Sequence, residues 1–302
     1  MRTAEVFVPA VISKVETIDP GEIRLIALTL QEEYEIGGRR YRVRDAMRPG
    51  NAFLARPLGA QSGKIRRRMY TRSNAAVTAP LILETIINHT HEERADTSIW
   101  WQSEQVEDLH RTGESIDVRM ALDAGRDELV VFENSPVCDP RNLRLEPDTE
   151  WPSMRIVAIA LSTGITPFLA YIDHMRAHAF GREPGRVGVH LTLIASVRHH
   201  RQLMRHEELL TVEREFPENF RYYPVLTRQW PESWPYGRGR VMCADDTCDG
   251  DLQVDLGPLL RLVPDLPGCD LRMCGNLACR QQLEAGLRQH GITVRSFRTE
   301  VW

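Results

Sequence analysis

Apolar strand-like runs alternate with helix-like runs along the second half of the sequence, and this order restricts the fold more than any other feature. The first strand-like run is "MRIVAIAL" at residues 154–161, a continuous apolar stretch typical of a parallel strand buried on both faces. A run with helical spacing follows, "GITPFLAYIDHMRAHA". The same order returns later with "RVGVHLTLIASV" and "LMRHEELLTVEREF", and again with "CDLRMCG" and "NLACRQQLEAGLRQHG". Strands that alternate with helices predict an α/β domain with a parallel sheet.

Short strand-like runs fill the first half, separated by turn signals such as "DPGE" and "RPGN". One helix interrupts them at about 98–109, and Thr97 or Ser98 is available as its cap. Many short strands with a single helix predict a small antiparallel β-barrel. We expect its strands at residues 6–15, 23–30, 52–55, 65–71, 80–87, 116–120 and 128–132.

The chain of 302 residues is long enough for two domains. A proline-rich segment at 134–152 lacks periodicity and is a linker or a loop beside a ligand. We therefore expect a β-barrel domain at residues 1–150 and an α/β domain at 151–302. The acidic loop at 242–251 is either a solvated loop or a determinant of partner choice.

Composition and charge exclude several classes of protein. The net charge of −4 excludes a generally basic nucleic-acid coat, and no run reaches the ~18 apolar residues of a membrane span. The N-terminal apolar stretch is short and interrupted, unlike a signal peptide, so we expect a cytoplasmic protein. Cys269, Cys274 and Cys279 lie five positions apart, which matches neither zinc nor iron–sulfur spacing. We predict reduced thiols and no metal.

Ligands of parallel sheets bind beyond the carboxyl ends of the strands, and the first such end is "STGITPF". Pro167 stands in the first turn of the following helix, whose free N–H groups suit a phosphate, although an ordinary capped helix fits these residues as well. Two more strands end near Arg198 and Arg228, and Arg240 follows. Together these arginines suggest recognition of an extra phosphate, hence NADPH rather than NADH; singly, each fits a solvated surface arginine.

The stretch "GKIRRRMYTRSN" is the densest in the barrel half. On a strand, Arg68, Tyr70 and Arg72 share one face. Arginine beside tyrosine suits a ligand with a phosphate and a flat ring, but a basic edge strand protected from aggregation has the same pattern.

Taken in order, these motifs resemble the ferredoxin–NADP reductase family over nearly the whole chain from about residue 5. The resemblance rests on "RPGNAFL", "RMYT", "STGITPF", "CGN" and the terminal "EVW". It implies an FAD-binding β-barrel domain followed by an NADP-binding α/β domain. Ala160, Leu161 and Ser162 stand where many relatives have more glycine.

The resemblance also implies roles for individual residues. For FAD, Arg68 would bind the pyrophosphate, Tyr70 would lie against the isoalloxazine, Thr71 would bond near flavin N5, and Ser98 would belong to the second phosphate-binding turn "ADTS". For NADPH, the implied pyrophosphate residues are Thr163, Gly164 and Thr166, and the implied 2′-phosphate site holds Arg198, Thr227, Arg228 and Arg240. The implied catalytic residues are Thr71, Cys274 near nicotinamide C4, Glu300 near the proton path, and Trp302.

Trp302 would cover the other face of the flavin and move aside for the nicotinamide, because hydride transfer needs close contact between the two rings. A plug in the core is the alternative for this residue.

The implied activity is transfer of a hydride from NADPH to FAD, followed by single-electron transfer to a ferredoxin or flavodoxin. Lys64, Arg66, Arg67 and Arg72 would then form a basic landing patch for an acidic partner, or serve FAD phosphate binding and a solvated edge. Two other functions remain open. One is a reductase dedicated to an oxygenase or to free flavin, and the other is a flavin-binding module without catalysis.

Overall fold

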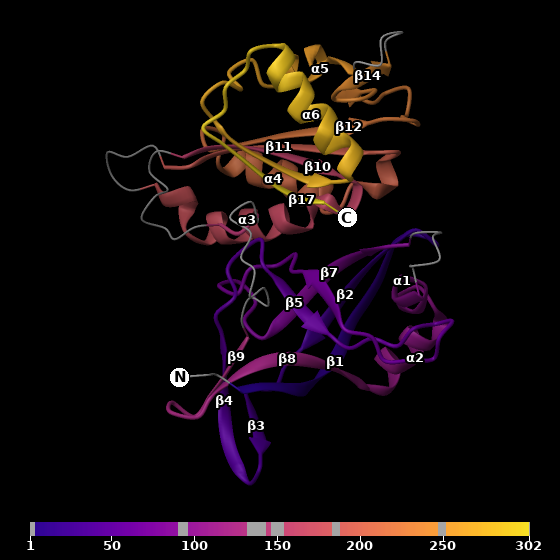
Figure 1. Cartoon of the computed structure of the whole chain (residues 1–302), viewed down its shortest axis with the longest axis vertical. Helices are drawn as coiled ribbons and strands as arrows, with labels where there is room; N and C mark the ends of the chain where they lie inside the picture. The colour runs from indigo at the N-terminus through magenta and orange to yellow at the C-terminus, as the bar shows by residue number, and fades with distance from the viewer. Residues whose placement is uncertain are drawn as a thin grey trace. The chain divides into compact units, whose positions relative to one another are not determined.

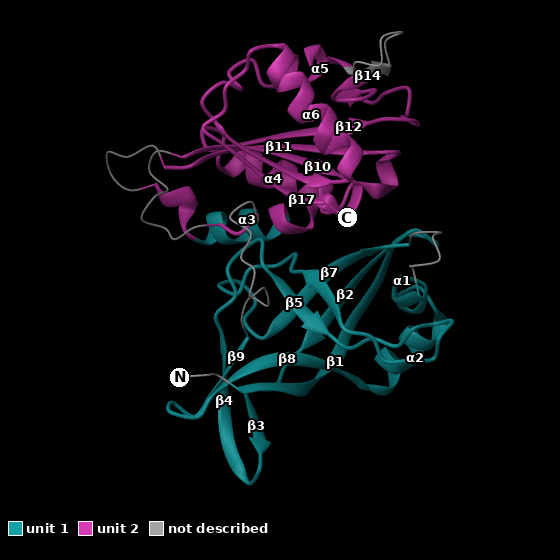
Figure 2. Cartoon of the chain, in the orientation of Figure 1, with its two compact units in different colours: residues 1–138, 169–177 teal, residues 139–168, 178–302 magenta. Residues whose placement is uncertain are grey.

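The computed structural model describes residues 4–89, 96–131, 143–145, 154–182, 188–246 and 252–301. Figure 2 shows two compact units: unit 1 is residues 1–138 with 169–177, and unit 2 is residues 139–168 with 178–302. The proline-rich segment lies outside the described residues except for 143–145. The domain boundary near residue 150 therefore stays a prediction.

Unit 1 is built on a curled sheet of short strands, drawn in indigo to magenta in Figure 1. Its strands are β1 (Ala4–Asp19), β2 (Ile23–Thr29), β3 (Glu33–Ile36), β4 (Arg39–Asp45), β5 (Ala52–Ala55), β6 (Arg68–Thr71), β7 (Ile82–Asn88), β8 (Ser115–Asp123) and β9 (Glu128–Val131). Its helices are α1 (Asp96–Trp101) and α2 (Glu104–Thr112).

The sheet of unit 1 runs in the order β3-β4-β9-β8-β1-β2-β7, and β5 leaves this path to pair with β6 and β8. All of these pairs are antiparallel except β4 with β9. Alternate residues of each strand point into one apolar core, which includes Val8, Phe53 and Val118. The predicted antiparallel barrel fold is confirmed.

Two details of unit 1 differ from the sequence prediction. The expected single helix is divided into α1 and α2 around Ser103, whose φ of −77° and ψ of 159° are extended. The hairpin of β3 and β4 was not predicted, although Gly37 and Gly38 form its turn with φ of 60° and 78°. Charged residues alternate with the few apolar ones along both strands, so the strands lack the apolar run that marks the others.

Unit 2 contains the alternating part of the chain. Its strands are β10 (Arg155–Leu161), β11 (His190–Val197), β12 (Phe220–Leu226), β13 (Gly237–Arg238), β14 (Cys243–Asp246), β15 (Leu252–Asp255), β16 (Asp270–Gly275) and β17 (Ser296–Val301). Its α-helices are α4 (His206–Glu215), α5 (Gly257–Leu262) and α6 (Leu277–Gln289), and α3 (Thr166–Ala177) begins in unit 2 and continues into unit 1. The 3₁₀ turns among the described residues of this unit are η2 (Ser162–Ile165), η3 (Ala179–Gly181) and η4 (His200–Gln202).

The main sheet of unit 2 runs in the order β13-β12-β11-β10-β16-β17, and every pair in it is parallel. Helices α5 and α6 and the β14–β15 hairpin cover one face, where Leu259 and Leu283 join Val157 and Ile159 in one core. Helix α4 packs on the opposite face, against Tyr222 of β12 (Figure 1). The predicted parallel α/β domain is confirmed. None of the helices in the described ranges has the length and apolar character needed to cross a bilayer.

Candidate functional site

The turn after β10, residues 162–166, brings several predicted nucleotide-binding residues to the carboxyl edge of the parallel sheet. The Thr166 hydroxyl donates to the Thr163 carbonyl oxygen at 2.6 Å and closes the turn. Helix α3 begins at Thr166 with Pro167 in its first turn, as expected. Ser162 has a φ of 51°, in the left-handed region. Glycine adopts that conformation without strain, whereas a residue with a Cβ rarely does, so the turn holds Ser162 in an unfavourable backbone conformation.

Gly164 allows this turn to pack directly on the backbone of β16. A Cβ atom at Gly164 would lie 2.2 Å from the Cys274 carbonyl oxygen and 2.7 Å from the Cys274 carbonyl carbon. One residue further along, a Cβ at Gly275 would lie 2.7 Å from a methyl carbon of Leu161. Both glycines are therefore required by close approach, and together they hold the turn beside the end of β16.

Cys274 and Glu300, the predicted catalytic pair, are direct register partners on the parallel strands β16 and β17. Residues in register lie on the same face of a sheet. Cys274 is buried and Glu300 is half-buried. Asn276 caps helix α6, because its side-chain oxygen accepts a hydrogen bond from the Cys279 N–H at 2.8 Å, as the sequence suggested. Trp302 lies outside the described residues, so its predicted role is untested.

Arg198, Thr227, Arg228 and Arg240 all follow the carboxyl ends of neighbouring strands. The Thr227 and Arg228 N–H groups donate to the carbonyl oxygens of Val197 and Arg198 at 2.8 and 3.0 Å, which joins the ends of β11 and β12. Arg240 comes two residues after β13, which pairs with β12. The guanidinium groups of Arg228 and Arg240 are exposed and form no ion pair with another described residue. The structure thus brings the predicted arginines to one edge.

The predicted flavin-binding residues of unit 1 lie on β6, the RMYT strand (Arg68–Thr71). Arg68 is exposed, and one of its N–H groups donates to the Arg67 carbonyl oxygen at 3.2 Å. Thr71 is half-buried. The Tyr70 ring packs on Phe53 and Trp101, with ring centroids 5.9 Å from each. Burial raises the pKa of the Tyr70 hydroxyl to about 12, so the phenol is neutral.

Ser98, from the predicted second phosphate-binding turn, lies half-buried in the first turn of α1. Asp96 precedes it and binds the loop between β5 and β6. Its carboxylate accepts hydrogen bonds from the Ser62 hydroxyl at 2.6 Å and from the Gln61 N–H at 2.7 Å. Gly59 makes room for this carboxylate, since a Cβ there would lie 2.1 Å from an Asp96 oxygen. These bonds, that of the Ser62 hydroxyl first, hold the pKa of Asp96 below its ordinary value.

Arg72 corrects the prediction of a landing patch that included it. Its side chain is buried, with the whole residue 1% exposed, and it donates to both carboxylate oxygens of Asp45 at 2.9 and 2.8 Å. It also donates to the carbonyl oxygens of Ala79 and Ile82 at 2.9 and 2.6 Å. Burial lowers the pKa of its guanidinium, which the Asp45 charge opposes. Arg72 comes directly after β6, which ends at Thr71, and its side chain is turned into the protein.

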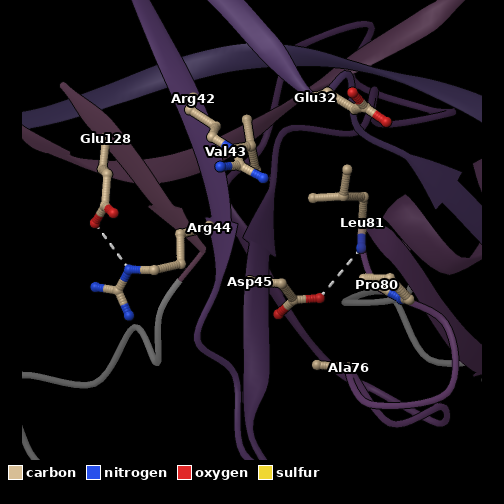
Figure 3. A pocket seen from close by; sticks show the side chains of 9 residues that line it. All are labelled: Glu32, Arg42, Val43, Arg44, Asp45, Ala76, Pro80, Leu81 and Glu128. Atoms are coloured by element: carbon tan, nitrogen blue, oxygen red, sulfur yellow. Dashed lines mark hydrogen bonds and ion pairs between the residues drawn. The ribbon is translucent and has the colours of Figure 1, made fainter.

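Asp45 also borders a polar cavity of about 490 Å³, which Figure 3 shows. One Asp45 oxygen accepts a hydrogen bond from the Leu81 N–H at 3.3 Å, and across the cavity Arg44 donates to Glu128 at 2.8 Å (Figure 3). No sequence pattern predicted this cavity. Arg44 and Glu128 pair with each other, and Asp45 bonds the Leu81 N–H, so the Asp45 side of the cavity supports the loop before β7.

The remaining residues of the predicted patch differ in exposure and in pairing. Lys64 and Arg67 are exposed, and the Arg67 guanidinium lies over the Phe7 ring at 5.3 Å. Arg66 is half-buried and pairs with Asp96, the two charged groups being 3.6 Å apart. The exposed part of this basic surface is therefore centred on Lys64 and Arg67.

The cysteines of unit 2 are dispersed. Cys269 is buried before β16, and burial raises the pKa of its thiol to about 11. Cys274 lies one residue before the end of that strand, and Cys279 belongs to α6. Within the described ranges, no three histidine, cysteine, aspartate or glutamate side chains are grouped as a metal ion would require.

Comparisons with known proteins agree with this geometry. The family model of the oxidoreductase NAD-binding domain matches residues 159–278, from β10 to the start of α6. A search of curated protein sequences found no match.

Among solved structures, the chain is similar to the Amycolatopsis cytochrome P450 reductase GcoB, with 19% identity, 99% of this chain and 72% of that chain covered, and a TM-score of 0.59. The flavohem-like FAD/NAD-binding domain of nitric oxide dioxygenase from Vibrio cholerae O1 biovar El Tor is 14% identical, with 100% and 99% covered and a TM-score of 0.63. Ferredoxin-NADP⁺ reductase from Plasmodium falciparum is 14% identical, with 99% and 95% covered and a TM-score of 0.54.

At these identities the likeness concerns the fold. Together with the matching domain model, it supports the two-domain fold that the motifs implied.

Proposed function

This chain has the two-domain fold of the ferredoxin-reductase-like flavoprotein oxidoreductases, and from that premise we propose that it is an NADPH-dependent reductase that holds FAD on unit 1. The observation that carries the proposal is the meeting of predicted site residues at one edge of the parallel sheet. Register places Cys274 beside Glu300. Gly164 packs the turn at residues 162–166, the proposed nucleotide turn, against the same strand end. Ligands of open parallel sheets bind beyond the carboxyl ends of the strands, and this turn lies at that edge.

Unit 1 offers groups of the right chemistry for FAD. Arg68 is an exposed guanidinium for the pyrophosphate, Tyr70 offers a ring, and Thr71 and Ser98 offer hydroxyl groups. When bound, FAD accepts a hydride from a nicotinamide and releases electrons one at a time. The protein's part is to hold and orient the cofactor.

Unit 2 offers the matching groups for the nucleotide. Thr163, Gly164 and Thr166 would receive the pyrophosphate at the start of α3. Arg228 and Arg240, with Arg198 and Thr227 beside them, would bind a 2′-phosphate and so favour NADPH over NADH. In this proposal the Cys274 thiol lies against the nicotinamide, and Glu300 holds a proton near it. Trp302 would cover the flavin and move aside.

The electron acceptor we propose is a small acidic redox protein of the ferredoxin or flavodoxin kind. The basic surface of Lys64 and Arg67, with Arg66 at its margin, suits such a partner. Charged surfaces of opposite sign steer association, and salt weakens this effect. Replacing both Lys64 and Arg67 with glutamine should slow reduction of the partner at low salt while leaving reduction of ferricyanide unchanged.

A reductase dedicated to one oxygenase is the second candidate. The likeness to a cytochrome P450 reductase supports it. The two candidates share the cofactors and differ in the acceptor, so reduction rates with a ferredoxin, a flavodoxin and a P450 would separate them.

An anaerobic titration with NADPH tests the proposal. The expected result is a protein that purifies with a flavin absorbance band, or acquires one with FAD, and that an equimolar amount of NADPH bleaches. Loss of this reduction in Cys274→Ala or Glu300→Ala would argue against a module without catalysis. A colourless protein that takes up no FAD would overturn the proposed function.

A further inference from the structure

The strand that carries Tyr70 would by itself restrain the side chain only weakly. Its strand, β6, pairs with β5 and with no other described strand. Its neighbour Met69 is 44% exposed. Phe53, the cross-strand partner of Tyr70, covers one part of the ring at a centroid distance of 5.9 Å and an interplanar angle of 41°. A ring that presents a fixed face to a flat ligand needs a further contact to restrain it.

Trp101 supplies that contact. Its indole N–H donates to the Tyr70 hydroxyl at 2.8 Å, and because indole nitrogen can only donate, the tyrosine oxygen must accept. The two rings are perpendicular, with an interplanar angle of 90°, an edge-to-face geometry that favours a defined orientation. The Thr97 side chain is a second hydrogen-bond partner of the same hydroxyl. Both partners belong to α1.

Helix α1 is itself fixed to the barrel. The buried Arg24 side chain donates to the carbonyl oxygens of Trp101 and Ser103 at 3.0 and 3.1 Å, and it pairs with Glu107 at 2.7 Å. Trp101 is 1% exposed. A helix fixed in this way can impose a position on a side chain from an edge strand.

We propose that Trp101 is a positioning residue for the flavin, because its indole N–H fixes the Tyr70 ring in the orientation that receives the isoalloxazine. The inference rests on the proposed function, since it assumes that FAD lies on Tyr70. It adds that the Tyr70 hydroxyl is engaged by α1, so the ring face and not the hydroxyl is left for the cofactor. It also joins the RMYT strand to the helix that carries Ser98, the two elements proposed to bind FAD.

Trp101→Phe tests this inference, with Trp100→Phe as its matched control. Trp100 is the next residue of α1, is 3% exposed, and donates its indole N–H to Gln105 at 3.0 Å instead of to Tyr70. Both variants lose the same atoms from the same core. Trp101→Phe should weaken FAD binding about fivefold to tenfold, as expected for one buried hydrogen bond. The fluorescence of bound flavin should also rise, and its visible circular dichroism should change. Trp100→Phe should leave the bound-flavin spectra as in the wild type.

A double-mutant cycle shows whether Trp101 acts through the Tyr70 hydroxyl. Tyr70→Phe keeps the ring and removes the acceptor, so Trp101→Phe should have little further effect on flavin spectra or affinity in that background. Thr97→Val, which keeps the shape and removes the second partner, should cause a smaller change of the same kind. If Trp101→Phe fails to fold, Tyr70→Phe and Thr97→Val still report on the same hydrogen bonds.

The outcomes separate this inference from the proposed function. A wild-type protein that binds no FAD overturns both. A wild type that binds FAD, with Trp101→Phe and Trp100→Phe alike or with additive effects in the cycle, overturns the positioning role alone. If Trp101→Phe does not fold, unchanged flavin spectra in both Tyr70→Phe and Thr97→Val overturn it as well.

Discussion

The nucleotide turn of unit 2 and the RMYT strand of unit 1 both carry short motifs, yet they are held in different ways. The turn is closed by Thr166 and Thr163, three residues apart, and packs on a strand in regular parallel register. The RMYT strand and Arg72, the residue that follows it, are held by residues distant in the chain: Trp101 is 31 positions from Tyr70, and Asp45 is 27 positions from Arg72. A motif inside a regular α/β unit is held by residues close to it in sequence, whereas a motif on an edge hairpin depends on side chains distant in sequence.

Asp45→Asn should have the largest effect, because it breaks the distant support of the RMYT strand. Removing one partner of a buried ion pair leaves an uncompensated charge and typically costs about 3–5 kcal/mol of unfolding free energy. Urea-induced unfolding would measure it. Glu128→Gln is the control, since Glu128 pairs with the more exposed Arg44 beside the same cavity, and such a pair is worth about 0–1 kcal/mol. Equal losses in the two variants would mean that the buried network is not what holds the strand.

Gly164→Ala should damage the local support of the nucleotide turn. The added Cβ meets the Cys274 backbone at 2.2 Å, and overpacking of this kind costs about 1–3 kcal/mol. The Michaelis constant for NADPH should rise together with the loss of stability, while FAD affinity should remain. Gly291→Ala is the control, because a Cβ there meets nothing within 4 Å and only its φ of 62° opposes substitution. An unchanged Michaelis constant in Gly164→Ala would show that nucleotide binding does not depend on this close approach.

This difference between local and distant contacts explains which features could be predicted from the sequence. The parallel sheet, the turn and the capping by Asn276 follow from apolar runs and local residue types, so they could be predicted. The arginines at the sheet edge could be predicted too, since the carboxyl ends of parallel strands meet at one edge.

The features that could not be predicted depend on contacts between residues distant in sequence. Arg68 and Arg72 looked equivalent in the alternation of a strand, but the strand ends at Thr71 and Arg72 finds a carboxylate on β4. Asp96 was noted only as part of the turn "ADTS", and Trp101 gave no signal beyond its place in a predicted helix. The adjacent tryptophans of α1 were a usable hint, because two large aromatic side chains in a short helix need a core to receive them.

Arg228→Ala and Arg240→Ala should change the choice of nucleotide more than stability. Each should raise the Michaelis constant for NADPH about tenfold, the effect of about one charged hydrogen bond, and leave that for NADH nearly unchanged. Arg238→Ala is the control, because that side chain donates to the carbonyl oxygens of Glu232 and Trp234 at 3.1 and 2.8 Å. Steady-state kinetics with both nucleotides would measure the ratio. A parallel rise for NADH and NADPH would argue against a 2′-phosphate site.

The smallest effect should appear in acid, where Asp96 loses its charge. The bonds from Ser62 and Gln61 hold the pKa of this carboxylate below its ordinary value, so the folded state binds its proton more weakly than the unfolded state does. The stability that Asp96 contributes is therefore complete above the unfolded pKa of about 3.9 and is lost as the pH falls through the lower folded value.

Asp96→Asn isolates this contribution when its melting temperature is compared with that of the wild type between pH 6 and pH 3, about two units above and one below the unfolded value. The difference in melting temperature should shrink as the pH falls. Protonation removes the carboxylate charge from the wild type, and the substitution has already removed that charge. Asp108→Asn, at a helix position 62% exposed and paired with Arg111, should show no such trend. If the difference for Asp96→Asn stays constant, the loop between β5 and β6 is held by Gly59 and the backbone rather than by the carboxylate charge. The support of the RMYT region would then be more local than its contacts suggest.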